Sequence, residues 1–136
     1  MRGRKQVFRL IQKNKRKPTA FSILLGLCLI FAGCAQQRAR NAQTEALFRA
    51  VREGNTDMVK SLVSGPGAEV NPTDERGNTP LLEAARFGHE DIARVLIAAG
   101  ANLNAKDRDG KTALMLAVQG DHDEVVRVLK HAGAVE

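Results

Sequence analysis

The fold is decided by residues 77–105, which read GNTPLLEAARFGHEDIARVLIAAGANLNA. Thr79 can cap a helix with its hydroxyl group, and Pro80 then takes the first helical position, where a missing N–H costs nothing. Gly88 ends this helix, because glycine adopts the left-handed conformation at little cost. A second helix is expected to begin at residues 89–91, whose acids suit the positive end of the helix dipole, and to end at Gly100. The stretch therefore predicts a helix–turn–helix unit.

The same unit returns 33 residues later in the chain. The matched pairs are Gly77 and Gly110, Thr79 and Thr112, Leu81 and Leu114, Ala84 and Ala117, His89 and His122, Ile92 and Val125, Val95 and Val128, Leu96 and Leu129, Gly100 and Gly133, and Ala101 and Ala134. A looser copy lies 34 residues upstream, where Leu47, Ala50, Gly54, Asp57, Met58 and Leu62 precede Leu81, Ala84, Gly88, Asp91, Ile92 and Leu96. Matches at a fixed period and in a fixed order predict three stacked copies of one unit.

This pattern resembles the ankyrin repeat family, whose unit is about 33 residues long and carries a Thr-Pro-Leu-His-x-Ala signature. The resemblance covers residues 43–136. It implies an all-α solenoid of three helix–turn–helix repeats with short β-turn fingers, at about residues 43–73, 74–106 and 107–136.

Two features depart from the family pattern. Phe48, Leu82 and Met115 replace the signature histidine, so we expect apolar packing to hold the repeats together there. The third copy carries Gly120–Asp121 where the middle copy has Phe87–Gly88, which predicts a shifted turn between its two helices.

The basic residues are concentrated at the N-terminus. Eight of the 21 Lys and Arg residues precede Pro18, whereas from Cys34 onward 13 Lys and Arg residues accompany 15 Asp and Glu residues. The formal net charge of +6 therefore describes the leader rather than the repeats. Nucleic-acid binding would need a basic stripe with stacking aromatics, and the part from Cys34 onward has two Phe and no Tyr or Trp. We therefore expect no nucleic-acid partner.

An uncharged apolar run, TAFSILLGLCLIFAG, occupies residues 19–33 and follows the basic leader at residues 1–18. This order predicts a secretory signal peptide. The small residues directly before Cys34 resemble the lipobox of bacterial lipoproteins. That resemblance implies cleavage before Cys34, a lipid on this cysteine and a place in the cell envelope. An uncleaved signal anchor and simple secretion are the alternatives.

The residues after Cys34 bear on where the domain lies. By the sorting rules of lipoproteins, Ala35 after the cysteine favours the outer membrane, with the domain facing the periplasm. Residues 34–42 are polar and lack a periodic apolar face, so we expect a linker. No cysteine follows Cys34, so the repeats need no disulfide in an oxidising compartment.

Few residues offer catalytic or metal chemistry. His89 and His122 recur where the second helices start, and hydrogen bonding to nearby backbone explains them. Equivalent positions on stacked helices lie about 10 Å apart, too far to share an ion directly. The acid pairs Asp107 and Asp109, and Asp121 and Asp123, lie in turn sequences. We expect no catalytic residue, no metal and no cofactor.

Protein recognition is the remaining class of function. In ankyrin repeats, partners dock on the finger tips and on the exposed ends of the first helices. Carried over by position, the partner-binding residues are Arg52, Glu53, Glu75, Arg76, Asn78, Arg86, Phe87, Arg108, Asp109, Lys111 and Gln119. Arg86 and Phe87 are the strongest candidates, because arginine and aromatic residues are typical interface hot spots. Packing between neighbouring first helices is the alternative for Phe87, and an ordinary solvated surface is the alternative for the charged tips.

The sequence thus predicts a non-catalytic protein–protein interaction module, exported and held at a membrane through Cys34. Its partner is another protein, which the sequence does not name. Two other functions stay open. A structural protein could self-associate through the last repeat, where Met115, Val118 and Val126 are expected to leave apolar surface. A metal-binding enzyme could use His89 and His122.

Overall fold

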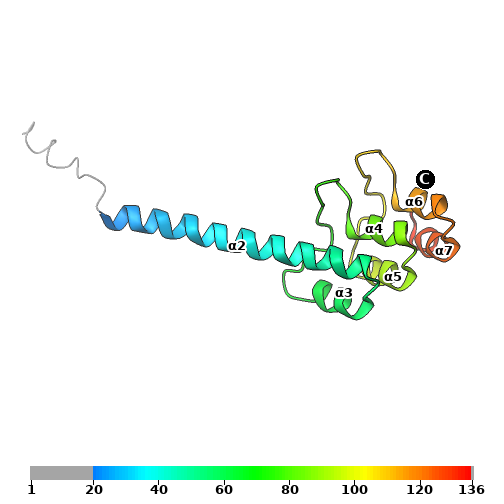
Figure 1. Cartoon of the computed structure of the whole chain (residues 1–136), viewed down its shortest axis with the longest axis horizontal. Coiled ribbons are helices and arrows are strands. Elements are labelled where there is room, and N and C mark those ends of the chain that lie inside the picture. Colours follow the sequence, from blue (N-terminus) through cyan, green and yellow to red (C-terminus); the bar gives the residue numbers. More distant parts are fainter. Residues whose placement is uncertain (1–19, 136) are drawn as a thin grey trace, which may run out of the picture. The chain divides into compact units, whose positions relative to one another are not determined.

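The computed structural model describes residues 20–135, and every element in that range is an α-helix (Figure 1). The helices are α2 (Ala20–Arg52), α3 (Thr56–Val63), α4 (Pro80–Phe87), α5 (Glu90–Ala98), α6 (Ala113–Gln119) and α7 (Asp123–Ala132). The predicted basic leader at residues 1–18 lies outside the described residues, and so does the side chain of Cys34. The contacts divide the chain after Ala39, and the unit from Arg40 onward contains all the helix pairs. The all-α solenoid predicted from the repeats is confirmed.

The middle helix pair is built as the residues 77–105 predict. The Thr79 hydroxyl accepts a hydrogen bond from the backbone N–H of Leu82 at 3.4 Å, and Pro80 is the first residue of α4. Gly88 ends α4 with a φ of 74°, in the left-handed region. His89 then precedes α5, although its side chain makes no capping hydrogen bond to that helix.

The turn between α6 and α7 keeps the geometry of the turn between α4 and α5. The backbone N–H of His122 donates to the carbonyl of Ala117 at 2.9 Å, matching the bond from His89 to Ala84 at 3.0 Å. Asp121 occupies the position of Gly88 and has a φ of 56°. The prediction of a shifted turn is therefore wrong. Asp121 instead adopts the left-handed conformation that glycine takes more easily, at a cost in local strain.

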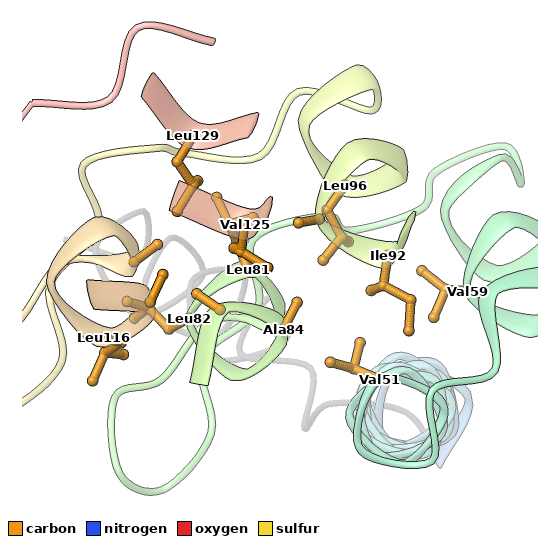
Figure 2. Close-up of a cluster of buried hydrophobic side chains, with 14 of the residues drawn as sticks. Val51, Val59, Leu81, Leu82, Ala84, Ile92, Leu96, Leu116, Val125 and Leu129 are labelled. Carbon is orange, nitrogen blue, oxygen red and sulfur yellow. The ribbon is translucent and has the colours of Figure 1, made fainter. Parts of the chain in front are cut away.

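The helices of the unit from Arg40 onward form two layers. The first helices pack side by side, with α4 against α6, and the second helices do the same in the order α3, α5 and α7. Their facing sides enclose the apolar core, where Val51 of α2, Val59 of α3 and Ile92 of α5 lie close together (Figure 2). Each repeat thus buries its apolar face on its neighbour, as stacked repeats must.

Asparagine side chains also join the repeats. The Asn71 side-chain oxygen accepts a hydrogen bond from the backbone N–H of Asn102 at 2.8 Å. Asn104 repeats this contact one unit later, with the backbone N–H of Val135 at 3.3 Å. Both bonds join residues 31 positions apart, so each connects one repeat only to the next.

Residues 34–42, the expected linker, lie inside α2 and are helical. The helix continues without a break to Arg52, so the first repeat lacks a separate finger before its first helix. None of the described helices combines the length and the apolar character needed to cross a lipid bilayer.

Candidate functional site

A groove of about 770 Å³ lies where the end of α2, the loop at residues 74–76 and helix α4 meet. Six of the predicted partner-binding residues line it: Arg52, Glu53, Glu75, Arg76, Arg86 and Phe87. The remaining lining residues are Thr44, Glu45, Phe48, Arg49, Asp74 and Glu83. Half of the lining residues were therefore predicted from the sequence, and they come from the first and second repeats.

Among the six lining residues that sequence reasoning missed, Glu83 is the one with a buried charge. It occupies the variable position of the signature, between Leu82 and Ala84, and only 6% of its surface is exposed. Its carboxylate lies 3.8 Å from the Arg52 Nε atom of α2. The one available signal was a charged residue inside the apolar side of α4, since a buried charge needs a partner.

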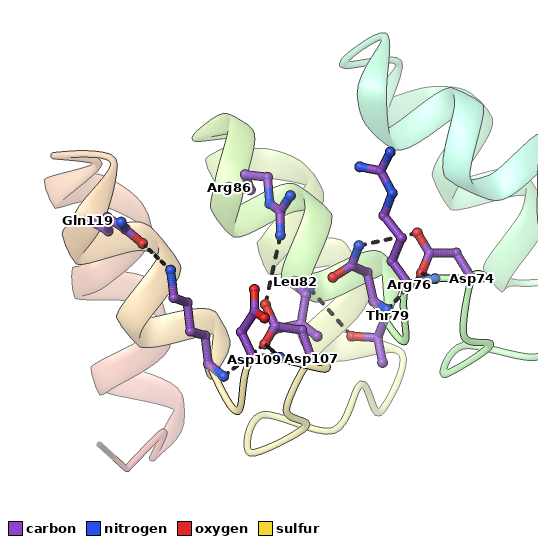
Figure 3. Close-up of polar contacts among 10 residues, drawn as sticks. Asp74, Arg76, Thr79, Leu82, Arg86, Asp107, Asp109 and Gln119 are labelled. Atoms are coloured by element: carbon purple, nitrogen blue, oxygen red, sulfur yellow. Dashed lines mark hydrogen bonds and ion pairs between the residues drawn. The ribbon is translucent and has the colours of Figure 1, made fainter.

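Arg86 makes the same kind of contact one repeat later. Its guanidinium lies 3.8 Å from the carboxylate of Asp107, a side chain that is only 4% exposed (Figure 3). Arg52 and Arg86 occupy equivalent positions, because each lies in the last turn of the first helix of its repeat. Each arginine therefore pairs with a buried acid of the following repeat. This contact holds the repeats together and leaves part of each guanidinium at the surface.

A single aspartate shapes each finger loop. The Asp74 carboxylate accepts hydrogen bonds from the backbone N–H groups of Arg76 and Asn78, both at 2.8 Å (Figure 3). Asp107 accepts equivalent bonds from Asp109 and Lys111 at 2.9 Å. These bonds fix the loops as turns, as expected for aspartate in such sequences.

Asn78 is not a surface residue. Its side-chain amide donates to the Asp74 carboxylate at 3.2 Å, and only 2% of the residue is exposed. The prediction that Asn78 contacts a partner directly is therefore wrong, because the amide is used to hold the turn.

The predicted residues of the third repeat lie outside this groove lining: Arg108, Asp109, Lys111 and Gln119. The Lys111 Nζ atom donates to the Gln119 side-chain oxygen at 2.9 Å, so these two residues already contact each other (Figure 3). The groove therefore brings together candidates of the first two repeats, whereas Arg108 of the third repeat lies beside Gly77 of the second finger loop.

The family model for ankyrin repeats in three copies matches residues 47–135. The chain belongs to the ankyrin repeat family.

Over 53 residues it is 49% identical to protein phosphatase 1 regulatory subunit 27 of Homo sapiens, a match that covers 39% of this chain and 34% of that protein. Over 64 residues it is 44% identical to the potassium channel AKT1 of Arabidopsis thaliana, covering 47% of this chain and 7% of that protein. The chain thus spans about a third or less of these relatives. Ankyrin repeats suggest a protein–protein interaction module.

The recurring histidines of the ankyrin repeats contact the preceding repeat. His122 Nε2 donates to the backbone carbonyl of Arg86 at 3.1 Å, across the repeat boundary. Its ring lies against Gly88, and the ring of His89 lies against Gly54 in the same way. Among the residues that the structure describes, no three His, Cys, Asp or Glu side chains lie close enough to hold a metal ion.

Phe87 lines the same groove, and 47% of its surface is exposed. Its ring centre is 6.1 Å from that of His89, with an angle of 31° between the two planes. His89 belongs to the same repeat as Phe87, so this contact is not the packing between neighbouring first helices that the sequence offered as an alternative. About half of an aromatic side chain therefore remains available at the groove, which is the property that an interface anchor needs.

Proposed function

We propose that the protein binds a protein partner in the groove between α2, the residue 74–76 loop and α4, and that it does so without catalysis. The observation that carries this proposal is the lining itself. It combines four arginines with a half-exposed phenylalanine, two of the residue types that contribute most to protein interfaces.

The mechanism is binding to a preformed surface. The Asp74 hydrogen bonds fix the finger loop that forms one wall of the groove. A partner therefore meets side chains whose backbone is already ordered, so less conformational entropy is lost on binding.

The test is co-purification of partners with the full chain and with an Arg76→Ala, Phe87→Ala variant. The two substitutions remove exposed groove side chains and leave the inter-repeat ion pairs intact. The matched control is Arg94→Ala, Arg127→Ala, which truncates exposed arginines on α5 and α7. A partner kept by the control and lost by the groove variant supports the proposal. Equal recovery from all three proteins contradicts it.

We also propose that the protein is exported and carries a lipid on Cys34. The support comes from the sequence, where the basic leader, the apolar residues 19–33 and the small residues before Cys34 follow the order of a lipoprotein signal. Anchoring would raise the concentration of the groove near a partner in the same membrane. Radiolabelled palmitate should label the native chain and not a Cys34→Ser variant. Labelling of both, or of neither, contradicts the proposal.

The proposed location is the outer membrane of a cell envelope, with the repeats facing the periplasm. It rests on Ala35, the residue after the proposed lipidation site. Separation of inner and outer membranes on a density gradient tests the location. The native chain should travel with the outer membrane, and an Ala35→Asp variant should move to the inner membrane. A native chain found only in the inner membrane contradicts this part of the proposal.

A further inference from the structure

We propose that the groove selects a partner segment that carries a lysine or arginine side chain, and that the Glu83 carboxylate receives this cation. The inference rests on the proposed function, because it names the chemistry of the partner that the groove would hold.

Glu83 is a nearly buried acid whose carboxylate still reaches solvent, because no fully enclosed side-chain oxygen among the described residues lacks a hydrogen-bond partner. Its side chain is 9% exposed, and its closest cation is the Arg52 Nε atom at 3.8 Å. The described residues donate no hydrogen bond to its carboxylate. An ionised carboxylate can accept about four hydrogen bonds, so Glu83 can take further N–H donors from a ligand in the groove. A basic side chain supplies such donors together with the opposite charge.

The charges of the lining favour the same ligand. The groove is lined by five carboxylates, those of Glu45, Glu53, Asp74, Glu75 and Glu83, and by four arginines, Arg49, Arg52, Arg76 and Arg86. Arg86 pairs with Asp107, which lies outside the lining, so its charge is already balanced from beyond the groove. Acids therefore exceed the remaining arginines, and a positively charged segment is attracted more than a negative one.

Phe87 provides the second contact for such a side chain. Glu83 and Phe87 are four residues apart on α4, so they lie on the same face of the helix, one turn from each other. Both line the groove, and half of the Phe87 surface is exposed there. A guanidinium or ammonium group held at Glu83 can thus lie against the face of the ring, an arrangement that attracts cations.

Arg52 competes with the ligand for the same carboxylate. The separation of 3.8 Å is too long for a hydrogen bond, and the Arg52 side chain is 56% exposed, so Arg52 can leave the carboxylate for solvent. A partner cation would displace Arg52 toward solvent. The inference therefore predicts opposite effects for the two members of the pair: loss of Glu83 weakens binding, and loss of Arg52 strengthens it.

The experiment is a selection of random dodecapeptides displayed on phage against the full chain, held in a mild detergent. Enriched peptides are synthesised with a fluorophore and titrated by anisotropy.

We expect the enriched peptides to have a lysine or arginine in common. We expect Glu83→Gln to weaken binding by about tenfold, in line with the loss of one charge-assisted hydrogen bond. The control Asp57→Asn, an exposed acid of α3 outside the lining, should change affinity by less than about twofold. Arg52→Gln should increase affinity. Circular dichroism verifies the fold of each variant, and Arg52→Gln gives an independent test if Glu83→Gln does not fold.

The outcomes separate this inference from the proposed function. The groove remains the binding site if the selected peptides bind Arg76→Ala, Phe87→Ala more weakly than the native chain. The Glu83 inference is then overturned if these peptides lack basic residues. It is also overturned if their affinity is unchanged by both Glu83→Gln and Arg52→Gln. If the selected peptides bind Arg76→Ala, Phe87→Ala as tightly as the native chain, both the proposed groove and the Glu83 inference are overturned.

Discussion

The imidazole of His122 lies so close to Gly88 of the preceding repeat that a β-carbon at Gly88 would be 2.6 Å from its Nδ1 atom. Gly88 also has a φ of 74°, a conformation that other residues adopt only with strain. Two requirements therefore meet at one glycine: the turn between α4 and α5, and the contact between two repeats.

Gly88→Ala should lower the free energy of unfolding by about 2 kcal/mol or more, because it combines backbone strain with a clash against His122. The matched control is Gly100→Ala. Gly100 has a φ of 93°, but a β-carbon there would meet nothing within 4 Å, so only the strain of about 1 kcal/mol applies. Urea denaturation followed by circular dichroism measures both. Equal losses would show that the His122 contact adds nothing.

Asp121→Gly should raise the free energy of unfolding by about 0.5–1 kcal/mol, because glycine relieves the left-handed strain between α6 and α7. The control is Asp123→Gly, two residues later in the first turn of α7. That substitution should instead lower the stability by about 1 kcal/mol, since glycine is unfavourable in a helix. Thermal unfolding of the two variants gives the comparison. A fall in stability for Asp121→Gly would mean that the aspartate side chain matters more than the strain.

Leu82→Lys and Met115→Lys compare equivalent positions of two repeats. Leu82 is 1% exposed, so a charge there should cost about 3 kcal/mol or unfold the domain. Met115 is 41% exposed, and its replacement should cost less than about 1 kcal/mol. Chemical denaturation of both variants measures the difference. Similar losses would show that Met115 is buried in solution, as self-association would require.

Asp74→Ala should loosen the finger loop that forms one wall of the groove. The carboxylate accepts three hydrogen bonds, from the backbone of Arg76 and from the backbone and side chain of Asn78, and its loss should cost about 2 kcal/mol. Glu75→Ala, at the exposed neighbouring position, is the control and should be nearly neutral. Hydrogen exchange should speed up at the amides of Arg76 and Asn78 in the first variant only. Unchanged exchange there would show that the loop is held by other contacts.

The start and end of each repeat helix could be predicted because they depend on neighbouring residues. Thr79, Pro80 and Gly88 act within a few positions of one another, and the structure places each as the pattern predicts. The helical state of residues 34–42 could not be predicted in this way. They lack an apolar face of their own, and their helical state follows from being continuous with the rest of α2. A sequence pattern read in short windows does not carry that information.

The groove was predicted in part. Position within the repeat identified Arg52, Arg76 and Phe87 as lining residues. It failed for Asn78, whose burial depends on a hydrogen bond to Asp74, and for Glu83, whose burial depends on the neighbouring repeat. The periodic pattern specifies which backbone positions face the groove, whereas contacts between repeats decide which side chains remain accessible.

The Asn71 and Asn104 bonds each reach only the adjacent repeat, so the domain can fray from its end in steps. The groove is lined by residues 44–87 and needs nothing from α6 or α7 in its lining. If α6 and α7 unfold transiently, the residues that line the groove remain folded. A bound partner would then stabilise the first two repeats.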